Sequence, residues 1–474
     1  TVSNSTQVGA NAQWVWWPPV APKRVRSSIS KNRPWLRHGF GRFPPAAAGL
    51  YQLAHLSGSD FSDLLGGDAG DNALYGNGGA DKLWGNGGDD ILDGGAGADV
   101  LDGGDGTNAA SYVGSAQAVA VDLATGKGAY GDAAGDTLIR IADVFGSDFA
   151  DTLVGDGADN SLYGGAGKDT LIGRGGDDFL EGGAGPDSLN GGAGDNMASY
   201  FGSSAGVTVN LATRAATGGD AQGDQLYFIS GLYGSGFADQ LSGDAGDNVL
   251  YGNGGADKLW GNGGNDILNG GAGADTLYGG AGYNVASYFG SLAGVSVNLA
   301  TGAAAGGDAQ GDLLYQITDL FGSDVADQLG GDASGNVLYG NGGADILWGN
   351  GGDDVLSGGA GADSLYGGGG RDLFLFEAAA DSGATAGTRD RIMDFTRGSD
   401  RIDLSDIDAN ASAGGNQAFN FIGGDAFTGV AGQLRVFTEA GALVVAGDLN
   451  GDRVADFTIA VSGTASLTAG DFAL

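Results

Sequence analysis

The chain has 474 residues, of which 99 are glycine and seven are proline, and its formal net charge at pH 7 is −37. Glycine at this level without a Gly-X-Y period and abundant proline excludes a collagen-like chain, and the negative charge disfavours nucleic acid as a partner. The absence of cysteine excludes disulfides and thiolate metal sites, and no run of 18 apolar residues marks a transmembrane segment.

Residues 1–50 differ in composition from the rest of the chain. They contain no Asp or Glu, seven of the 21 Lys and Arg residues, six of the seven prolines and four of the seven tryptophans. No continuous apolar stretch of the kind found in an N-terminal signal peptide is present. We interpret this segment as a basic, Pro- and Trp-rich disordered tail or a sequence artefact. A tether to a membrane or a polyanion is the alternative.

From residue 51 to residue 374 the sequence repeats a nine-residue pattern, x-G-(G/N)-x-G-x-D-x-L, as in YGNGGADKLWGNGGDDILDGGAGADVL at 75–101. Six units make up each of four blocks, whose starts lie 88 residues apart. The blocks are 57–110, 145–198, 233–286 and 321–374. Spacers of 34 residues with V-x-V-N-L alternation join them. We expect the spacers to continue the coil without metal, and a separate small β element is the alternative.

The nine-residue unit predicts a turn followed by a short strand. Glycine tolerates positive φ, so G-G-x-G-x-D can turn sharply, and x-L-x then forms a strand with the leucine inward. Two units complete a coil, so loops 18 residues apart stack on one edge. One leucine per nine residues is a thin core, and stacked aspartates repel each other unless a cation lies between them. Carboxylate and carbonyl oxygens suit Ca²⁺, whose binding then becomes folding free energy.

The pattern resembles the RTX, or hemolysin-type, calcium-binding nonapeptide family. The resemblance implies an all-β fold, a parallel β-roll or β-solenoid with a C-terminal β-sandwich-like capping domain. It also implies several Ca²⁺ ions, about three to four per block. The motif aspartates implied as ligands are Asp81, Asp90, Asp99, Asp169, Asp178, Asp187, Asp257, Asp266, Asp275, Asp345, Asp354, Asp363 and Asp372. Weaker members, with an amide in the same position, are Asn72, Asn160, Asn248 and Asn336. The FGSD-type loops lack the second glycine and are not expected to form full sites at Asp63, Asp151, Asp239 and Asp327.

A third composition begins near residue 375, where glycine becomes less frequent and strand-like alternations such as QLRVF and DFTIAV appear. The stretches RDRIMDFTRGSDRIDLSDIDAN (389–410), NQAFNFIG (416–423) and GDLNGDRVADF (447–457) resemble the C-terminal domain of serralysin-type secreted metalloproteases. The resemblance assigns residues 375–474 to a closing β domain. It implies four further calcium ligands, with an ordinary acidic turn as the alternative for each: Asp390, Asp394, Asp400 and Asp403.

The stretch DLNGD at 448–452 begins like an EF-hand loop. Its glycine is two positions early and no glutamate follows at position 12, so we expect an ordinary turn.

The chain ends in an acidic residue followed by three apolar ones, DFAL. This ending resembles the uncleaved C-terminal signal of type I secretion. The resemblance implies the type I secretion machinery as a partner and an extracellular or cell-surface location.

The sequence contains no convincing catalytic constellation. The two histidines, His38 and His55, are not in an HExxH motif. The stretch GSSAG at 202–206 fits a nucleophile elbow, but the sister spacers read GSLAG and GSAQA, so Ser204 is not expected to be catalytic. Carboxylate pairs such as Asp89 and Asp90 are better explained by calcium than by glycosidase chemistry.

One aromatic pair recurs in the blocks, and we expect it to pack against the structure. A sugar- or surface-binding face is the alternative. The pairs are Tyr75 with Trp84, Tyr251 with Trp260, and Tyr339 with Trp348.

Together these features predict a secreted, non-enzymatic calcium-binding RTX protein whose β-roll folds on Ca²⁺ outside the cell after type I secretion. Two alternatives remain open. The chain is the C-terminal export and stability region of a secreted metalloprotease, lipase or epimerase whose catalytic part precedes Thr1, or it is an RTX adhesin or surface-layer protein that binds cells or glycans.

Overall fold

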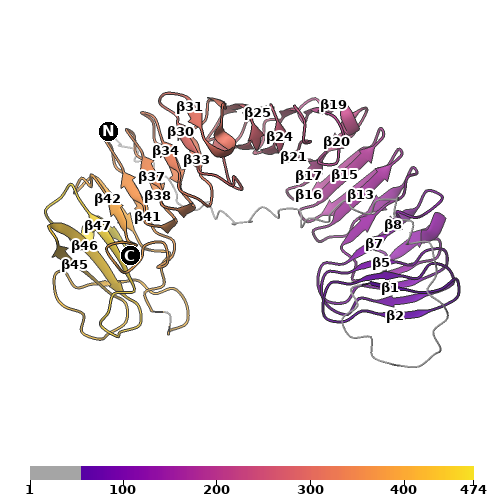
Figure 1. Ribbon diagram of the computed structural model, residues 1–474, viewed down its shortest axis with the longest axis horizontal. Coiled ribbons are helices and arrows are strands. Elements are labelled where there is room, and N and C mark those ends of the chain that lie inside the picture. Colours follow the sequence, from indigo (N-terminus) through magenta and orange to yellow (C-terminus); the bar gives the residue numbers. More distant parts are fainter. Residues whose placement is uncertain (1–54, 411) are drawn as a thin grey trace, which may run out of the picture. The chain divides into compact units, whose positions relative to one another are not determined.

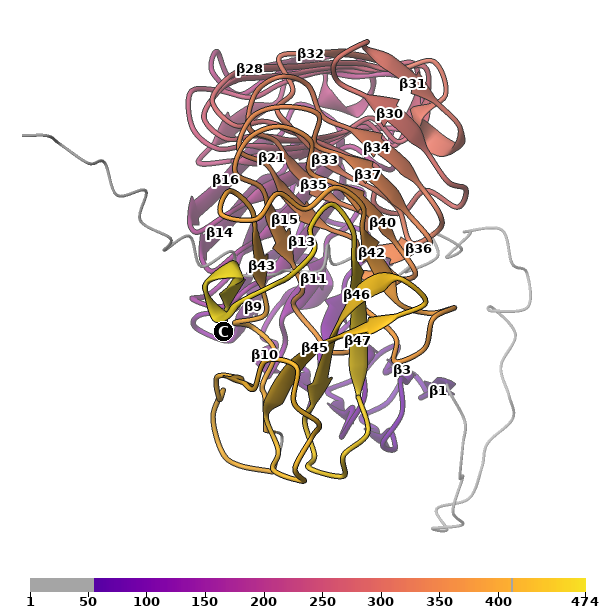
Figure 2. The same ribbon diagram turned by 90° about the vertical axis from the view of Figure 1, so that its left-hand side faces the viewer.

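A computed structural model describes residues 55–410 and 412–474 (Figures 1 and 2). Residues 1–50, for which a disordered tail or a tether was predicted, and His38 lie outside the described residues. Within the described ranges every regular element is a β-strand or a short 3₁₀ helix. The prediction of an all-β fold is therefore confirmed.

Each nonapeptide forms one short strand with a single inward side chain. In β4 (Lys82–Trp84) the middle residue Leu83 is fully buried, whereas its two neighbours are partly or fully exposed. The next strand along the chain, β5 (Ile91–Asp93), buries Leu92 in the same way. Because side chains alternate along a strand, a three-residue strand places one residue in the core. The core is consequently a narrow column of leucines.

The turns between the strands require left-handed backbone and close contact between coils. Gly79 has a φ of +116°, and a Cβ on it would lie 2.5 Å from the carbonyl carbon of Phe61 in the preceding coil. Asn77 also has positive φ, 73°, and its side-chain amide donates to the carbonyl of Gly58 at 2.9 Å. Glycine is thus needed at Gly79 for both conformation and space.

Strands 18 residues apart pair in parallel and in register. Leu74 of β3 (Ala73–Tyr75) lies beside Leu92 of β5, and on the opposite face Leu83 of β4 lies beside Leu101 of β6 (Val100–Asp102). On one face these pairings join into an 18-stranded sheet, which we call the continuous sheet. Its other strands are β1 (His55–Ser57), β7 (Ala109–Ser111), β11 (Asp143–Phe145), β13 (Ser161–Ala166), β15 (Phe179–Ala184), β17 (Met197–Ser199), β21 (Gly231–Tyr233), β23 (Val249–Tyr251), β26 (Ile267–Asn269), β29 (Val285–Ser287), β33 (Asp319–Phe321), β35 (Val337–Tyr339), β38 (Val355–Ser357), β41 (Leu373–Leu375), β43 (Arg401–Asp403) and β48 (Phe472–Ala473).

The opposite face consists of three separate sheets of 10, 6 and 10 strands. The first contains β2 (Leu64–Gly66), β4, β6, β10 (Thr137–Ile139), β9 (Lys127–Ala129), β8 (Ala120–Asp122), β12 (Thr152–Val154), β14 (Thr170–Gly175), β16 (Ser188–Ala193) and β20 (Gln225–Tyr227). The second contains β19 (Ala215–Thr217), β18 (Thr208–Asn210), β22 (Gln240–Ser242), β25 (Lys258–Gly263), β28 (Thr276–Ala281) and β32 (Leu313–Tyr315). The third contains β31 (Ala303–Ala305), β30 (Ser296–Asn298), β34 (Gln328–Gly330), β37 (Ile346–Trp348), β40 (Ser364–Tyr366), β42 (Asp390–Ile392), β47 (Phe457–Val461), β46 (Ala442–Asp448), β45 (Gln433–Glu439) and β44 (Asn420–Phe421). Two short pairs form in the loops, β24 (Gly254–Gly255) with β27 (Ala272–Gly273) and β36 (Gly342–Gly343) with β39 (Ala360–Gly361).

The spacers continue the coil and add a hairpin to it. In the first spacer β8 pairs with β12 of the following coil, whereas β10 pairs with β6 of the preceding coil. The antiparallel strand β9 lies between β8 and β10, and η2 (Gly131–Ala133) follows it. The other two spacers repeat this arrangement with η3 (Gly219–Ala221) and η4 (Gly307–Ala309). In them β20 and β32 also pair with the preceding coil, but they do not pair with the hairpin strands β19 and β31 as β10 pairs with β9, which divides the face into separate sheets.

The region after residue 374 is built directly onto the roll. β43 extends the continuous sheet from β41, and β48 extends it from β43. On the other face β42 pairs with β40 and with β47, which begins the antiparallel group of β47, β46 and β45. The last 3₁₀ turn, η5 (Ala469–Asp471), precedes β48. The closing β region therefore covers the open end of both faces.

Candidate metal centre

Two columns of Asp and Asn side chains run along the roll, one at each edge. The first-edge column comes from loops that leave the continuous sheet, and in the second block its members are Asp151, Asp169 and Asp187, followed by Asp224 of the next spacer. The second-edge column comes from loops that return to that sheet, and its members there are Asn160, Asp178 and Asn196. The first and third blocks have the same residue types 88 positions away. The columns follow from the 18-residue coil, because equivalent loop positions stack on one another.

Backbone hydrogen bonds fix the register of each column. The N–H of Asp151 donates to Oδ1 of Asp169 at 2.7 Å, and the N–H of Asp169 donates to Oδ1 of Asp187 at 2.8 Å. At the second edge, the N–H of Asn160 donates to Oδ1 of Asp178 at 2.9 Å. One oxygen of each inner carboxylate is therefore committed to the preceding coil.

The second oxygen of these carboxylates has no protein partner. In the part of the chain that the structure describes, fourteen aspartates have a buried Oδ2 atom without a hydrogen bond. They are Asp81, Asp90, Asp99, Asp169, Asp178, Asp187, Asp257, Asp266, Asp275, Asp345, Asp354, Asp363, Asp372 and Asp390. Each of these side chains is at most 2% exposed. Buried polar atoms without a partner are rare in folded proteins and call for a bound water or ion. Thirteen of the fourteen are the motif aspartates, and the fourteenth is Asp390.

A backbone carbonyl faces the same space as eight of the fourteen Oδ2 atoms that have no hydrogen bond, which we call orphaned. A Cβ placed on Gly164 would lie 2.5 Å from Oδ2 of Asp169 and 2.6 Å from the carbonyl oxygen of Gly182. Gly173 has the same relation to Asp178 and to the carbonyl of Gly191. Glycine thus leaves a small space that is lined by a carboxylate and a carbonyl oxygen, which are the ligands that Ca²⁺ prefers.

Backbone carbonyl oxygens are needed as metal ligands because the side chains alone are too few to hold an ion. Among the described residues, no group of three or more His, Cys, Asp or Glu side chains is arranged to hold a metal ion. An ion beside Asp169 would take most of its ligands from the loop backbone and from water. Such an all-oxygen set fits a hard cation, and the residues present fit calcium on this test.

Burial makes these carboxylates costly to ionise without a cation. Burial raises the pKa of Asp169 to about 7, with the charge of Asp187 adding to the effect of burial and the N–H of Asp151 opposing it. Burial likewise raises the pKa of Asp257 and of Asp345 to about 8. Desolvation disfavours the charged form, so protons compete with cations for these oxygens near neutral pH.

The amide members of the columns are satisfied within the protein. Oδ1 of Asn160 accepts from the N–H of Asp156 at 2.8 Å, and its Nδ2 donates to the carbonyl of Ala142 at 3.0 Å. Asn248 and Asn336 donate in the same way to the carbonyls of Ser230 and Thr318. In the first block Oδ1 of Asn72 accepts from the N–H of Asp68 at 2.7 Å, and its Nδ2 donates to Oδ1 of Asp68 at 3.4 Å. The structure thus places all four predicted asparagines in the column and gives each a protein partner.

The aspartates of the FGSD loops are also satisfied by the protein. Oδ2 of Asp151 accepts from the N–H of Ser147, and both carboxylate oxygens accept from the Ser147 hydroxyl at 2.9 and 3.0 Å. Asp239 and Asp327 have the same arrangement with Ser235 and Ser323. A serine thus stands where the repeat elsewhere has glycine, and it occupies the carboxylate oxygens of these loops.

Six column members were missed by the sequence reasoning. Asp136, Asp224 and Asp312 lie in the spacers, and each accepts the N–H of the last first-edge aspartate of its block at 2.8 Å. Asn108, Asn196 and Asn284 end the second-edge columns and accept in the same way. The spacers do contain a recognisable motif, G-D-x-x-G-D-x-L, whose second aspartate is the column member. This aspartate follows its hydrogen-bonding partner by 37 residues instead of 18, so a search for an 18-residue period does not find it.

The four aspartates predicted near the C-terminus have different surroundings. Asp390 joins the first-edge column, because Oδ1 accepts the N–H of Asp363 at 2.9 Å and Oδ2 is orphaned. Asp400 joins the second-edge column, but its Oδ2 accepts the N–H of Thr396 at 2.7 Å. Asp394 accepts from the backbone of residues 367 and 368. Asp403 accepts from the backbone and hydroxyl of Ser405 and lies in neither column.

Loop 448–452 is a hydrogen-bonded turn, as expected from its sequence. The two oxygens of Asp448 accept the N–H groups of Gly451 and Arg453 at 2.7 and 3.0 Å. Asn450 and Asp452 accept from the backbone two residues further on. The acceptors that an EF-hand would offer to an ion are thus used by the loop itself.

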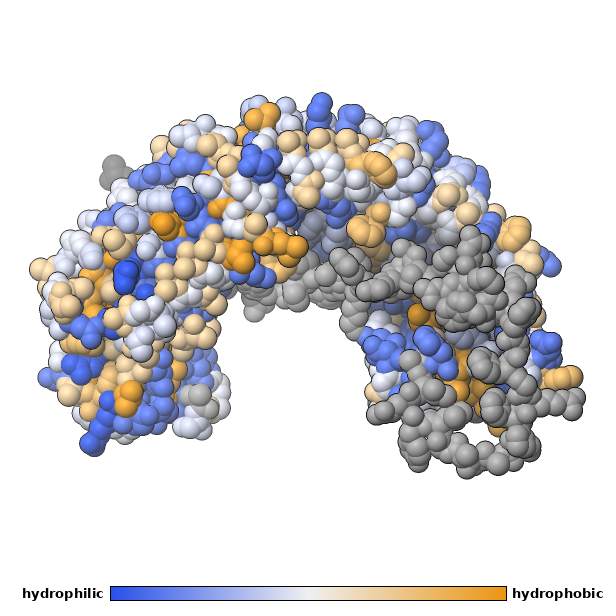
Figure 3. All heavy atoms as spheres, in the orientation of Figure 1, coloured by the Kyte–Doolittle hydropathy of each residue, from blue (hydrophilic) through white to orange (hydrophobic). Residues whose placement is uncertain are grey.

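The aromatic pairs noted in the sequence do not lie side by side. Tyr251 is in β23 of the continuous sheet, whereas Trp260 is in β25 on the opposite face. Each ring packs instead along its own sheet, Tyr251 on Tyr233 at 4.5 Å and Trp260 on Tyr278 at 5.8 Å between ring centroids. Hydrophobic and hydrophilic residues are interspersed on the face shown in Figure 3. These rings therefore have packing partners within the roll.

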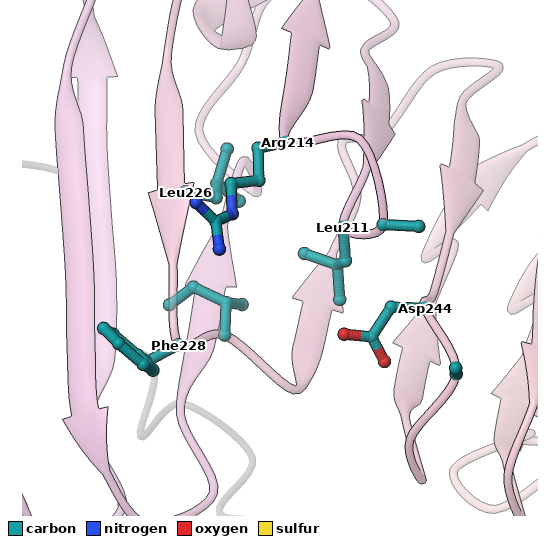
Figure 4. Close-up of a pocket in the computed structure, with 8 residues that line it drawn as sticks. Leu211, Arg214, Leu226, Phe228 and Asp244 are labelled. Atoms are coloured by element: carbon teal, nitrogen blue, oxygen red, sulfur yellow. The ribbon is translucent and has the colours of Figure 1, made fainter.

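One cavity of about 390 Å³ lies beside the β18–β19 hairpin of the second spacer (Figure 4). Leu211, Leu226 and Phe228 line it together with Arg214 and Asp244. It contains no histidine, and Ser204 is not part of it.

Among the described residues no helix has the length and apolar character needed to cross a membrane.

Two sequence-family models match this chain. The model described as RTX calcium-binding nonapeptide repeat (4 copies) matches residues 57–92 and 75–109. The repeats of residues 57–109 therefore match calcium-binding RTX nonapeptides, as the motif indicated. Neither this family nor the serralysin C-terminal domain is a catalytic region.

Similar individual proteins cover only parts of the chain. The metallopeptidase AprA of Pseudomonas marginalis is 42% identical over 96 residues, 20% of this chain and 18% of that protein. The metalloprotease AprA of Pseudomonas entomophila is 40% identical over 99 residues, 20% of this chain and 19% of that protein. The matched region thus spans about one-fifth of the length of these curated relatives.

Two solved structures are also similar. A subunit of the mannuronan C5-epimerase of Azotobacter vinelandii is 34% identical, with a TM-score of 0.24, over 32% of this chain and 78% of that one. The extracellular lipase LipA of Serratia marcescens is 19% identical, with a TM-score of 0.21, over 50% of this chain and 40% of that one.

The broadest match is to the model described as Peptidase M10 serralysin C terminal, which covers residues 150–474. This range includes the second block from residue 150 on, the third and fourth blocks and the closing β region, which is well over half of the chain. The paired columns, the RTX repeats and this match agree, and the chain belongs to the serralysin C-terminal family.

Proposed function

We propose that this protein is a secreted calcium-binding RTX protein whose roll folds when Ca²⁺ binds outside the cell, after export by a type I system. The observation that carries the proposal is the set of fourteen buried, orphaned Oδ2 atoms, repeated in register at the two edges. Thirteen of them belong to the nonapeptide aspartates.

The small core and the acidic composition of the roll support coupling between calcium binding and folding. Most of the described nonapeptide strands have a single fully buried leucine, and in β7, β17 and β29 an alanine takes its place. Residues 51–474 have 58 acidic and 14 basic residues. Ionised carboxylates stacked coil upon coil oppose the compact state, and cations between them reverse that effect. Because the two-coil site does not exist in the unfolded chain, binding free energy is folding free energy.

The calcium gradient across the cell envelope supports the location. Extracellular calcium modules bind at about 10⁻⁴–10⁻³ M, so such sites remain empty in a calcium-poor cytosol. A ligand at 100 times its Kd adds about 2.7 kcal/mol per site to folding stability. Many such sites together would switch an extended, exportable chain into the folded roll.

A calcium titration tests the proposal. We expect far-UV circular dichroism of the full chain to show little β structure after calcium removal, and a cooperative gain of β signal as Ca²⁺ is added. Mg²⁺ at equal concentration should give little change, because it requires a strict octahedral site and loses water reluctantly. A chain that keeps its full β signal without divalent ions at about pH 9, where the column carboxylates are ionised, would refute calcium-dependent folding.

The relatives favour a second candidate, in which this chain is the export and stability region of a larger secreted enzyme. The metalloproteases that match do so over only about one-fifth of their length. The reading frame upstream of Thr1 discriminates, since an in-frame HExxH domain favours the enzyme and a start codon close to Thr1 favours the free-standing protein. Proteolytic activity of the extended product would be the biochemical check.

A further inference from the structure

We propose that protein hydroxyls and amides replace calcium at both ends of each column, so that the spacers are metal-free boundaries and each of the first three blocks is a closed calcium module. The inference rests on the proposed calcium function and goes beyond it. It concerns which carboxylates do not bind an ion and which side chains prevent this.

Tyrosine closes the first-edge column at its C-terminal end. The hydroxyl of Tyr200 donates to Oδ2 of Asp224 at 3.1 Å, and both side chains are buried. Tyr112 with Asp136 and Tyr288 with Asp312 repeat the contact at 3.0 and 3.2 Å. Asp224 otherwise resembles Asp187, because its Oδ1 accepts the N–H of the preceding column member at the same distance, 2.8 Å. The tyrosine hydroxyl is therefore what distinguishes a satisfied Oδ2 from an orphaned one.

Serine closes the same column at its N-terminal end. The Ser235 hydroxyl donates to the Asp239 carboxylate at 2.9 Å, and the N–H of Ser235 donates to Oδ2 at 2.6 Å. The N–H of Val207, from the preceding spacer, donates to Oδ1 of Asp239 at 2.6 Å. Asp239 thus has partners on both oxygens, whereas Asp257, one coil later, has an orphaned Oδ2.

Amides close the second-edge column at both ends. Nδ2 of Asn160 donates to the carbonyl of Ala142, and Nδ2 of Asn196 donates to the carbonyls of Gly194 and Phe228. Only Asp178, between them, keeps an orphaned oxygen. An amide nitrogen is a donor and cannot bind a cation, so an asparagine at this position ends the series.

Each block therefore has a fixed number of carboxylates that can bind calcium. The first three blocks each keep three orphaned carboxylates, whereas the region from 321 onward keeps five, because Asp372 and Asp390 continue the columns. The Tyr–Asp contacts satisfy the last aspartate of each first-edge column without a cation. Calcium binding to one block is thereby separated from calcium binding to the next.

The test compares adjacent members of one column in the full chain, with bound Ca²⁺ counted by native mass spectrometry. We expect Asp187→Asn to bind one ion fewer than the parent chain, because the amide keeps Oδ1 and removes the anionic oxygen. We expect Asp224→Asn to bind the same number as the parent. Loss of an ion in Asp224→Asn would overturn the inference, since it would show that Asp224 is a ligand.

A second variant keeps the test decisive if Asp224→Asn fails to fold. Tyr200→Phe retains the ring and the carboxylate and removes only the hydroxyl. An unchanged number of ions, or one additional ion at the freed Oδ2, supports the inference, and one ion fewer overturns it. A parent chain that binds no calcium would instead refute the proposed function, so the two failures are distinguishable.

Discussion

Asp169 and Asp187 are joined by one hydrogen bond, in which the N–H of Asp169 donates to Oδ1 of Asp187 at 2.8 Å, and the remaining oxygen of each carboxylate is buried without a partner. The same contact fixes the register between coils and points an unsatisfied anionic oxygen into a space beside a glycine. Folding register and ion binding are thereby properties of the same side chains.

Replacing one inner carboxylate should weaken calcium-dependent folding. In Asp257→Asn the orphaned Oδ2 becomes an amide nitrogen, so we expect the calcium midpoint of folding to rise and the number of bound ions to fall by one. A matched control is Asp247→Asn, whose side chain is exposed and accepts the N–H of Asn265 through an oxygen that asparagine retains. Equal midpoints for the two variants, measured by circular dichroism, would contradict the assignment of Asp257.

Filling the space beside the carboxylate should have a similar effect without changing any charge. A Cβ on Gly252 would clash with Oδ2 of Asp257 and with the carbonyl of Gly270. We expect Gly252→Ala to lower calcium affinity and to shift the folding midpoint upward. Gly236→Ala is the control, because nothing lies within 4 Å of its Cβ position. Calorimetric titration of both variants measures the difference, and comparable affinities would show that the space is not used by an ion.

Calcium-free protein should be more stable in acid than in mild alkali. Burial raises the pKa of Asp169 and Asp178 to about 7 and of Asp257 and Asp345 to about 8, above the value of about 3.9 in an unfolded chain. A raised folded-state pKa contributes stability that is fully present below about pH 4 and is lost as the pH rises through 7–8. We expect β signal in metal-depleted buffer at about pH 5 and its loss by about pH 9.

Added calcium should flatten this pH profile. Ions hold the carboxylates in their charged form, so the proton is no longer needed for the compact state. Urea titrations with and without Ca²⁺, across the same pH range, provide the measurement. A metal-free chain that becomes more stable as the pH rises from 5 to 9 would have the opposite sign and would contradict the burial of these groups.

The leucine column should matter even when calcium is saturating. Leu259 in β25 is fully buried, and removing such a side chain typically costs roughly 2–5 kcal/mol. We expect Leu259→Ala to lose stability in that range in calcium-saturated urea unfolding. Leu292→Ala should be nearly neutral, because Leu292 is 96% exposed. Similar losses in both variants would argue against the inward position of Leu259.

The nonapeptide frame predicted the fold and most of the column because each unit has a fixed length. Leu83 and Leu92 are inward, and the aspartates from Asp81 to Asp372 stack, because nine residues per strand leave the chain no other register. Asp136 was not predicted because an inserted hairpin displaces it from the 18-residue period. The role of Tyr112 was equally hidden, since a contact between residues 24 positions apart in a spacer depends on how that hairpin folds back.

The aromatic pairs show a different limit. Tyr251 and Trp260 are nine residues apart, which places them on opposite faces once two strands make one coil. The local spacing was visible in the sequence, but which side chains become neighbours was decided by the coil. Asp403 is a separate case, because its side chain accepts from Ser405 two residues further on, in the ordinary acidic turn that was the alternative for this residue.

The last residues of the chain have a place in the sheet that bears on export. Phe472 is buried, β48 pairs with β43, and Asp471 accepts from both the backbone and the hydroxyl of Thr468. Under the export route proposed above, a type I transporter would bind this ending only before the roll closes. In that case calcium binding inside the producing cell would bury the C-terminal signal and block export.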